Sequence, residues 1–372
     1  MLDIAVRHRT RKASTARWWA RPLGIWIVWR LLSFGIFVAV GGKPIVGAAR
    51  WDDGYYLTIL RQGFRPNPAY GEFQQTSFFP LLPWTTRAVQ TVVRSETLAV
   101  HVVVSAASIA AVLLVYSIAR RHRDETTALL AIGVLLVSPG SIWLWLFYPE
   151  GMFIALSAGA LLAAETHRPW LAAVLGSGVA MTRSLGVVIV LPLLLAQAEH
   201  RPRAQRWRVD RTTVTALVPI SGLLVVMAAQ WWQAGDPLAY PKTSALWGSH
   251  PTLPIVPLIE RLQEMFVLGL FNGVTLADWL CIVVVLWLIA HSLRTPLSWS
   301  MRSWMIAMAF VPLVSGLSHC WSRYMLVAWP AAILAADKLR DRPRITVGVI
   351  FLSLAFLEFQ IASAWHGGLF IG

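Results

Sequence analysis

Apolar runs separated by short polar segments recur along the whole chain. Most of these runs are roughly 15–20 residues long, the length that an α-helix needs to cross the hydrocarbon layer of a bilayer. The pattern predicts an all-α protein with about eleven membrane-spanning helices, whose boundaries are good to about four residues. The predicted helices lie near Pro22–Val40, Thr97–Ile118, Thr126–Phe147, Gly151–Ala164, two short helices within Trp170–Glu199, Thr213–Trp232, Ala277–Leu293, Trp304–Leu317, Tyr324–Ala336 and Ile345–Ser363.

The apolar run Trp170–Glu199 is interrupted at Arg183. A single crossing would leave the basic loop 201–211 on the outer side, against the rule that basic loops stay in the cytoplasm. Two short helices that meet at Arg183 return this loop to the cytoplasm. They also explain the arginine, because a charge at membrane depth is tolerated where it faces a polar cavity. We therefore predict a broken pair of helices with its turn on the outer side.

Composition supports a membrane protein and sets its orientation. Of the 372 residues, 57% are hydrophobic and only 13% are charged, too few charges to cover a soluble protein of this size. The 32 Lys and Arg residues exceed the 18 Asp and Glu, but they gather in short loops, so topology and anionic lipids explain them better than nucleic acid does. We predict a cytoplasmic basic segment at residues 1–21, a single membrane domain at residues 22–372, and a C-terminus on the outer side.

The segment 41–96 is too polar and too rich in Pro, Gly and Gln to cross the membrane as one helix. We predict a large outer loop that carries catalytic residues and interfacial helices. Trp51, Tyr55 and Ile59 follow i, i+4 spacing and therefore share one face of a short helix. Because Trp and Tyr favour the boundary between lipid and water, we place this helix in the membrane interface.

Ionisable residues from four separated segments fall on the outer side of this predicted topology. They are Asp52, Asp53, Glu150, Arg183, His319 and Arg323. Each has a structural interpretation on its own, since an acid in the first turn of a helix favours the dipole and an arginine can snorkel to lipid phosphate. Their convergence on one face favours a functional site.

These residue types suit the transfer of a group from a lipid phosphate. A carboxylate near the interface can take the proton of a sugar hydroxyl. Arg and His can neutralise a phosphate that leaves with growing negative charge. Because such a leaving group needs no further activation, and because Cys281 and Cys320 lack metal-ligand spacing, we predict no cofactor and no essential metal. No Gly-rich phosphate loop is present, which argues against a cytosolic nucleotide substrate.

Five short motifs follow one another across about residues 22–340. They are Arg50–Tyr56 with Gly63-Phe64, Phe78–Pro83, Ser138-Pro139 with Tyr148–Phe153 and Thr182–Gly186, His319 with Ser322–Tyr324, and Gly235–Ala239. In order and spacing they resemble the PIG-V family of mannosyltransferases, members of the GT-C superfamily of membrane glycosyltransferases. Pro149 and Gly151 depart from the commoner small polar residues of that family, which bears on the acceptor more than on the fold.

The resemblance implies a GT-C fold and an inverting transfer of mannose from a polyprenyl-phosphate donor to a hydroxyl of a glycolipid, polysaccharide or protein. It implies that Asp52 is the catalytic base. It implies substrate-binding roles for Asp53, Glu150, Arg183, His319, Arg323 and Tyr324. The Arg- and Trp-rich composition suggests a bacterial plasma membrane, with the active site on its extracytoplasmic face.

Three other functions remain open at this point. A GT-C transferase could use another polyprenyl-phosphate sugar, such as arabinofuranose or glucose. A transporter or flippase for a lipid-linked sugar should show paired broken helices in repeated halves, whereas this sequence shows one break and no internal repeat. A non-catalytic scaffold would leave the clustered ionisable residues unexplained.

Overall fold

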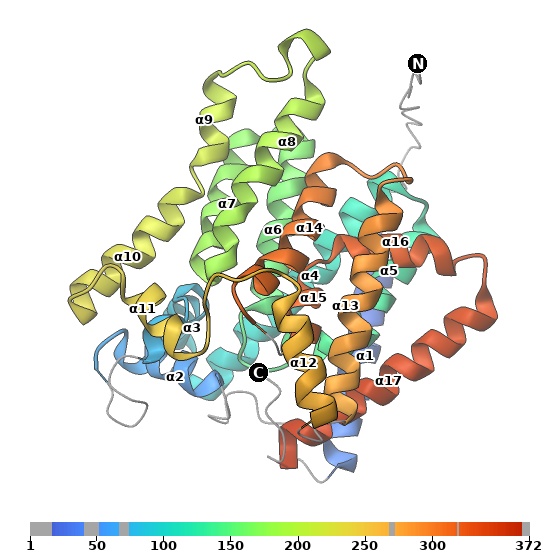
Figure 1. The fold of residues 1–372 in the computed structure, drawn as a ribbon, viewed down its shortest axis with the longest axis horizontal. Helices are drawn as coiled ribbons and strands as arrows, with labels where there is room; N and C mark the ends of the chain where they lie inside the picture. Colours follow the sequence, from blue (N-terminus) through green and yellow to red (C-terminus); the bar gives the residue numbers. More distant parts are fainter. Residues whose placement is uncertain (1–16, 41–51, 67–73, 268–271, 318–319, 367–372) are drawn as a thin grey trace.

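The computed structural model describes residues 17–40, 52–66, 74–267, 272–317 and 320–366. Within these ranges all regular structure is helical, without a β-strand (Figure 1). The α-helices are α1 (Ala20–Ala39), α2 (Asp53–Gln62), α3 (Leu81–Val93), α4 (Glu96–His122), α5 (Glu125–Val137), α6 (Glu150–Glu165), α7 (Pro169–Thr182), α8 (Val190–His200), α9 (Arg211–Leu217), α10 (Ile220–Ala234), α11 (Ala239–Leu246), α12 (Val256–Val267), α13 (Gly273–Ser292), α14 (Trp299–Val314), α15 (Trp321–Leu326), α16 (Pro330–Leu339) and α17 (Pro343–His366). The described 3-10 helices are η2 (Gln74–Ser77), η3 (Pro139–Leu144), η4 (Ser184–Ile189) and η5 (Arg203–Gln205).

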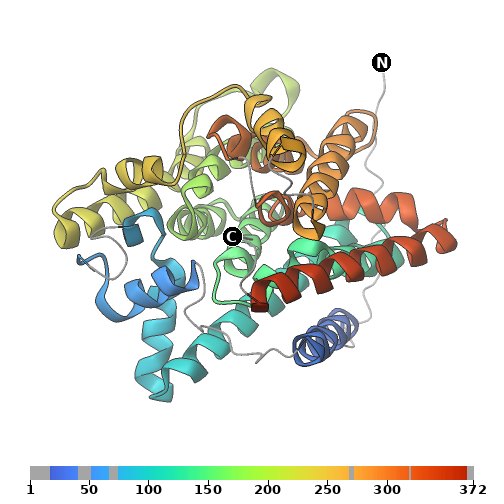
Figure 2. The same ribbon diagram turned by 60° about the horizontal axis from the view of Figure 1, so that its bottom comes forward.

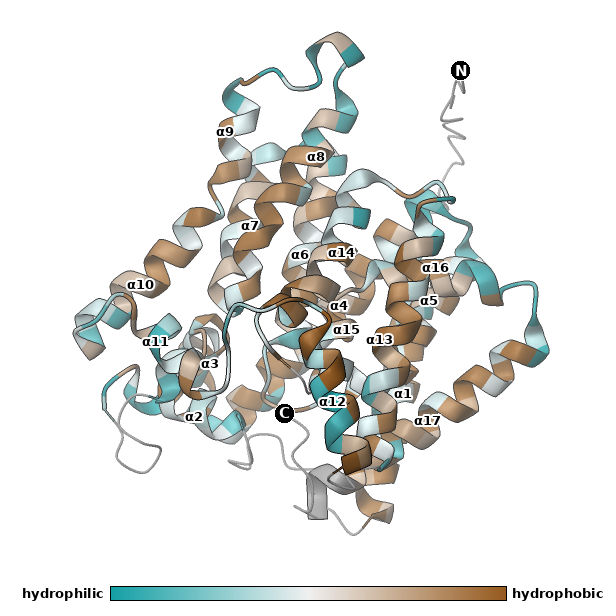
Figure 3. Ribbon diagram, in the orientation of Figure 1, coloured by the Kyte–Doolittle hydropathy of each residue, from teal (hydrophilic) through white to brown (hydrophobic). Residues whose placement is uncertain are grey.

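Among the described residues, five helical segments are long and apolar enough to cross a membrane by themselves. They are α1, α4, α9 together with α10, α13 and α17. Figure 3 shows hydrophobic residues along α10, α13 and α17, and hydrophilic residues in the loops at their ends. This pattern makes the chain an integral membrane protein, as predicted. The number of about eleven crossings stays a prediction, because several of the other helices are shorter than a bilayer is thick.

The helix α6 forms the centre of the bundle and packs against α4, α7 and α8. Ala158, Gly159 and Ala160 are buried on α6, and such small residues let neighbouring membrane helices approach closely. A Cβ added at Gly159 would lie 3.2 Å from Cδ1 of Leu175 on α7. Because α6 is enclosed on several sides, its first residue, Glu150, is held inside the protein and is fully buried.

The predicted break at Arg183 is confirmed, because α7 and α8 form a hairpin. The rings of His167, before α7, and His200, at the end of α8, lie 4.5 Å apart between centroids, so both helices end on the same side of the protein. The turn at the other end is tight, since a Cβ added at Gly186 would lie 2.1 Å from the carbonyl oxygen of Val179. Arg183 therefore stands at the tip of a helical hairpin.

The predicted outer loop contains α2, η2 and α3 in its described part. The predicted short helix exists as α2, but it is packed inside the protein and does not present an open aromatic face. Ile59 is only 2% exposed, and the ring of Tyr55 stacks on Phe78 with centroids 4.7 Å apart. Trp51 lies outside the described residues. The loop thus packs against the bundle, and the position of α2 in the membrane interface stays a prediction.

Two predicted helices are shorter or divided in the structure. The run from Thr126 leaves the α-helical conformation at Ser138, because Pro139 begins the 3-10 helix η3. The run from Tyr324 is divided into α15 and α16 by residues 327–329. Helix α17, the dark red helix at the front of Figure 2, packs against η3 and α5. These interruptions bring Tyr148, Glu150 and Arg323 into the centre of the protein.

The two ends of the bundle carry different kinds of segment. At one end, Glu96 at the start of α4 pairs with Arg61 of α2, with an N–O distance of 2.6 Å. At the other end, Arg340 pairs with Asp124 beyond the last turn of α4. In Figure 1 the α8–α9 loop lies at the top, while α2, α3 and α11 lie towards the lower left. The basic loops and the predicted outer loop therefore stand at opposite ends, and the assignment of compartments stays a prediction.

Candidate active site

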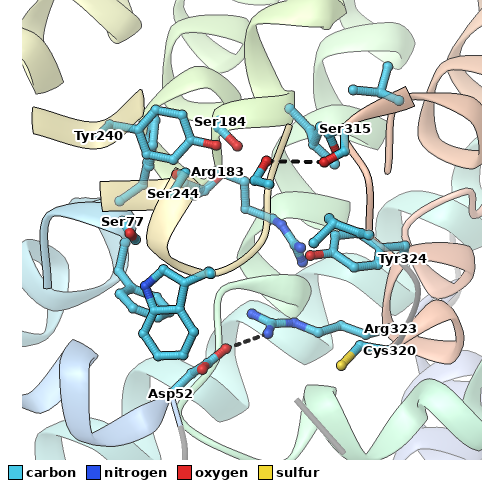
Figure 4. Close-up of a pocket in the computed structure, with 18 of the residues that line it drawn as sticks. Asp52, Ser77, Arg183, Ser184, Tyr240, Ser244, Ser315, Cys320, Arg323 and Tyr324 are labelled. Atoms are coloured by element: carbon cyan, nitrogen blue, oxygen red, sulfur yellow. Dashed lines mark hydrogen bonds and ion pairs between the residues drawn. The ribbon is translucent and has the colours of Figure 1, made fainter. Parts of the chain in front are cut away.

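Asp52 precedes α2 and faces away from the helix it begins. Its carbonyl oxygen accepts the N–H of Tyr56 at 3.2 Å, and its own N–H donates to the hydroxyl of Tyr148 at 3.1 Å. Its side chain makes no capping hydrogen bond to α2. Oδ2 instead accepts from Nη1 of Arg323 at 2.6 Å (Figure 4). The backbone of Asp52 is thus fixed by two elements while its carboxylate points toward α15.

Arg323 on α15 joins two carboxylates. Its Nη1 donates to Asp52, and its Nε donates to Oε1 of Glu150 at 2.5 Å. Its guanidinium carbon lies 4.7 Å from the ring centroid of Tyr148, a cation–π contact. Arg323 is only 6% exposed, so its contacts are made largely out of water, where charge-assisted hydrogen bonds are strong.

Glu150 is a shared anchor for two arginines. Oε1 accepts from Nε of Arg323 and from Nη1 of Arg183. Oε2 is buried and has no hydrogen-bond partner among the described residues. Glu150 does not line the cavity beside it. In this geometry the carboxylate holds the two guanidinium groups, and substrate binding by Glu150 stays a prediction.

Arg183 reaches the same place from the tip of the α7–α8 hairpin. Its backbone is extended, with φ −154° and ψ 151°, between the end of α7 and the start of η4. Its guanidinium carbon lies 5.0 Å from the ring centroid of Tyr324. Arg183 and Tyr324 both line the cavity, and Figure 4 shows them side by side above the pair of Asp52 and Arg323.

These side chains border a cavity of about 440 Å³, a size typical of small-molecule sites. Within the described part of the chain, Asp52 is the only carboxylate that lines it, and Arg183 and Arg323 are the only guanidiniums. The remaining wall is neutral. Its residues are Tyr56, Ser77, Phe78, Phe79, Thr182, Ser184, Leu185, Val187, Val188, Tyr240, Ser244, Trp247, Ser249, Val311, Ser315, Leu317, Cys320 and Tyr324.

Five of the residues singled out in the sequence come together here, namely Asp52, Glu150, Arg183, Arg323 and Tyr324. Asp53 is buried on the first turn of α2, beside the cavity and not on its wall. His319 lies outside the described residues. No group of three or more His, Cys, Asp or Glu side chains that could hold a metal ion occurs within the described ranges.

Asp278 is a site-forming residue that we did not single out in the sequence. It is 1% exposed on α13. Oδ1 accepts the N–H of Ser322 at 2.9 Å, and Oδ2 pairs with Nη2 of Arg261 at 3.4 Å. Ser322 precedes Arg323, so Asp278 fixes α15 from behind. Its signal in the sequence is a carboxylate inside the apolar run 277–293, which is costly in a membrane without a partner.

Part of the chain matches a known family model. Residues 76–232 match the model described as dolichyl-phosphate-mannose-protein mannosyltransferase. The match covers less than half of the chain. It includes Glu150 and Arg183 and leaves out Asp52 and Arg323. No curated protein matches the chain.

The chain is also similar to solved structures of the Archaeoglobus fulgidus oligosaccharyltransferase. For the form tethered to an acceptor peptide the TM-score is 0.54 at 14% identity, covering 94% of this chain and 55% of that one. For the apo form the TM-score is 0.52 at 14% identity, covering 94% of this chain and 56% of that one. For AglB in complex with an inhibitory peptide and a dolichol-phosphate the TM-score is 0.51 at 14% identity, covering 93% of this chain and 56% of that one. The chain thus spans little more than half the length of these structures.

At 14% identity these likenesses establish the fold and not the activity. The fold is of the GT-C type, as the sequence predicted. The partial family match points to the same superfamily of membrane glycosyltransferases. Neither comparison distinguishes the PIG-V family within it, and that relationship stays a resemblance.

Proposed function

We propose that this protein is an inverting glycosyltransferase that moves mannose from a polyprenyl-phosphate donor to an acceptor hydroxyl on the extracytoplasmic face. The observation that carries this proposal is the pairing of one cavity-lining carboxylate with two cavity-lining guanidiniums. Asp52 uses Oδ2 to accept from Arg323. Its Oδ1 has no hydrogen-bond partner in the described structure, which leaves this oxygen to accept the proton of a hydroxyl.

The proposed step balances as a single displacement. The acceptor oxygen forms a bond to the anomeric carbon while the bond from that carbon to the phosphate oxygen breaks. The hydroxyl proton passes to Asp52, and the electron pair leaves with the lipid phosphate. Arg183 and Arg323 neutralise the charge that grows on this phosphate, and Tyr324 lies beside Arg183 to donate a further hydrogen bond. Attack from the face opposite the phosphate inverts the anomeric centre.

The lining of the cavity supports a lipid-linked donor. Leu185, Val187 and Val188 of η4 and Val311 of α14 give the cavity an apolar part of its lining. An isoprenoid chain needs such an apolar passage when its phosphate binds between arginines. The dolichol-phosphate in the AglB complex and the dolichyl-phosphate mannose in the description of the family model favour the same kind of donor.

The proposal is tested by sugar transfer in membranes that contain wild type or Asp52→Asn, with labelled polyprenyl-phosphate mannose as donor and a membrane lipid extract as acceptor. Asn keeps the size of the side chain but cannot act as a base, so we expect transfer to fall by about two orders of magnitude or more. Asp341→Asn is the matched control, because that side chain is 85% exposed at the other end of the protein.

Other outcomes would redirect the assignment. Full activity of Asp52→Asn at equal expression would move the base to another carboxylate. The choice of mannose rests on the family description and on sequence resemblance, so donors that carry arabinofuranose or glucose belong in the same assay. If wild type transfers none of these sugars, the transporter interpretation is favoured. The measurement is then the movement of the lipid-linked sugar across the membrane of vesicles that contain the protein.

A further inference from the structure

The cavity has a second wall that the proposed transfer step does not use. Ser77 ends η2, Tyr240 and Ser244 lie on α11, and Trp247 follows α11; all four line the cavity. In Figure 4, Ser77, Tyr240 and Ser244 stand across the cavity from Arg323 and Tyr324. This neutral wall, as we name these four residues, therefore faces the charged groups that we assign to the donor phosphate.

Two polar atoms of the neutral wall are buried without a partner. Neither Oγ of Ser77 nor Nε1 of Trp247 has a hydrogen-bond partner among the described residues. Buried polar atoms in proteins are nearly always paired. Both residues line the same cavity, so a small side-chain rotation would bring either atom to its wall, where a hydroxyl group of a ligand would pair with it.

Aromatic rings stand beside these polar atoms. Trp247 packs edge-on against Tyr55 and Phe78, with centroid distances of 5.5 and 6.1 Å. Tyr240 packs edge-on against Phe79 at 5.2 Å. Aromatic side chains combine a flat apolar face with a polar tip in Tyr and Trp. A sugar ring matches this pair of features, because its C–H groups lie flat on an aromatic face while its hydroxyls reach donors at the rim.

The neutral wall is held in a fixed shape by α10. The buried side chain of Gln230 donates from Nε2 to the carbonyl oxygen of Thr76 at 2.8 Å. Its Oε1 accepts the N–H of Tyr240 at 3.2 Å. The hydroxyls of Thr76 and Thr243 lie 2.7 Å apart and join η2 to α11. Three elements are thus tied together behind the wall, which suits a preorganised binding surface.

We propose that the neutral wall of Ser77, Tyr240, Ser244 and Trp247 binds a sugar ring of the acceptor, so that the receiving hydroxyl belongs to a glycan. This inference rests on the proposed transferase function. Two polar atoms on this wall lack a partner among the described residues, and aromatic rings stand beside them. A Ser or Thr side chain of a peptide acceptor is too small to cover the aromatic faces, and it cannot pair with both polar atoms.

The experiment uses the full chain in detergent with labelled polyprenyl-phosphate mannose and two acceptor probes, octyl α-mannoside and a peptide rich in Ser and Thr. We expect transfer to the mannoside and none to the peptide. Ser77→Ala should raise the KM for the mannoside about three- to tenfold, and Trp247→Leu about tenfold or more. The KM for the donor should stay within about twofold, since these residues lie across the cavity from the charged groups and do not touch them. Trp232→Leu is the matched control, because Trp232 is 91% exposed on α10.

Failure of the inference and failure of the proposed function are distinguishable. Slow release of mannose to water without any acceptor reports donor binding and depends on Asp52 and the two arginines, but not on the neutral wall. Transfer to the peptide but not to the mannoside, with Asp52-dependent release intact, overturns the glycan acceptor and leaves the transferase standing. An equal rise in both KM values in the Trp247 and Ser77 variants overturns the acceptor role of the wall. Absence of transfer and of release in wild type overturns both proposals.

Discussion

Two networks of carboxylates and arginines, one in the centre of the protein and one at an end of the bundle, differ in burial. In the first, Glu150 is fully buried and the side chain of Arg323 is 7% exposed. In the second, the paired side chains of Arg340 and Asp124 are 39% and 40% exposed. An exposed pair is screened by water and adds little to stability. A buried pair bears a desolvation cost that often exceeds its Coulomb gain. The buried network beside a cavity is therefore better explained by function than by stability.

The largest effect beyond Asp52 is expected at Glu150. In Glu150→Gln the amide cannot balance the positive charges of Arg183 and Arg323, so both guanidiniums lose their shared anchor. We expect transfer to fall by about two orders of magnitude, measured by the rate of mannose transfer at equal expression. Asp124→Asn, in the exposed network, is the control and should stay within about twofold. A Glu150→Gln enzyme with wild-type rates would contradict the positioning role.

A smaller effect is expected at Asp278, in the buried pair behind α15. Asp278→Asn keeps one acceptor oxygen for the N–H of Ser322 but loses its charge toward Arg261. We expect kcat to fall about three- to tenfold with the KM for the donor unchanged, because Arg323 is displaced and not removed. The kcat of the Asp278→Ala variant should fall further, because alanine also removes the acceptor for the N–H of Ser322. A change in KM alone would place Asp278 in donor binding.

The exposed network should respond least. Arg340→Gln should leave transfer within about twofold and change the free energy of unfolding by about 1 kcal/mol or less. The pKa of Asp124 lies below its ordinary value, chiefly because the N–H of Thr127 donates to it, with Arg340 adding to the effect. The unfolded chain then binds more protons than the folded one, so this contribution is present above the ordinary pKa and is lost as pH falls. Thermal unfolding of wild type and Arg340→Gln, followed from neutral to acidic pH, would check both the small change in stability and its loss as pH falls.

No effect at all is expected from metal removal. The proposed leaving group is already a lipid phosphate, and the arginines supply the positive charge that it needs. Transfer should therefore be equal with and without a strong chelator. Loss of activity in chelator that added divalent cation restores would overturn this prediction and direct attention to Asp52 and Asp53.

Sequence patterns predicted the architecture where one local constraint dominated. Arg183 inside an apolar run leaves few arrangements that satisfy the charge, so the hairpin could be predicted. Asp278 gave the same kind of signal, and we overlooked it. The pairing of Asp52 with Arg323 joins residues 271 positions apart, and helix packing alone decides such a contact. Ser77 and Trp247 belong to residue types that are common in any chain, so only the cavity reveals them.

The α7–α8 hairpin has a consequence for how the protein is made. Its helices have 14 and 11 residues, and both stay shorter than the roughly 20 residues that cross a bilayer core even when η4 is counted with α8. We therefore expect the two helices to enter the membrane as one unit, carrying Arg183 with them. Chain order places Asp52 and Glu150 before Arg183, and Arg323 after it. During synthesis the carboxylates thus precede the guanidiniums, and each arginine enters the membrane with a counter-charge already in place.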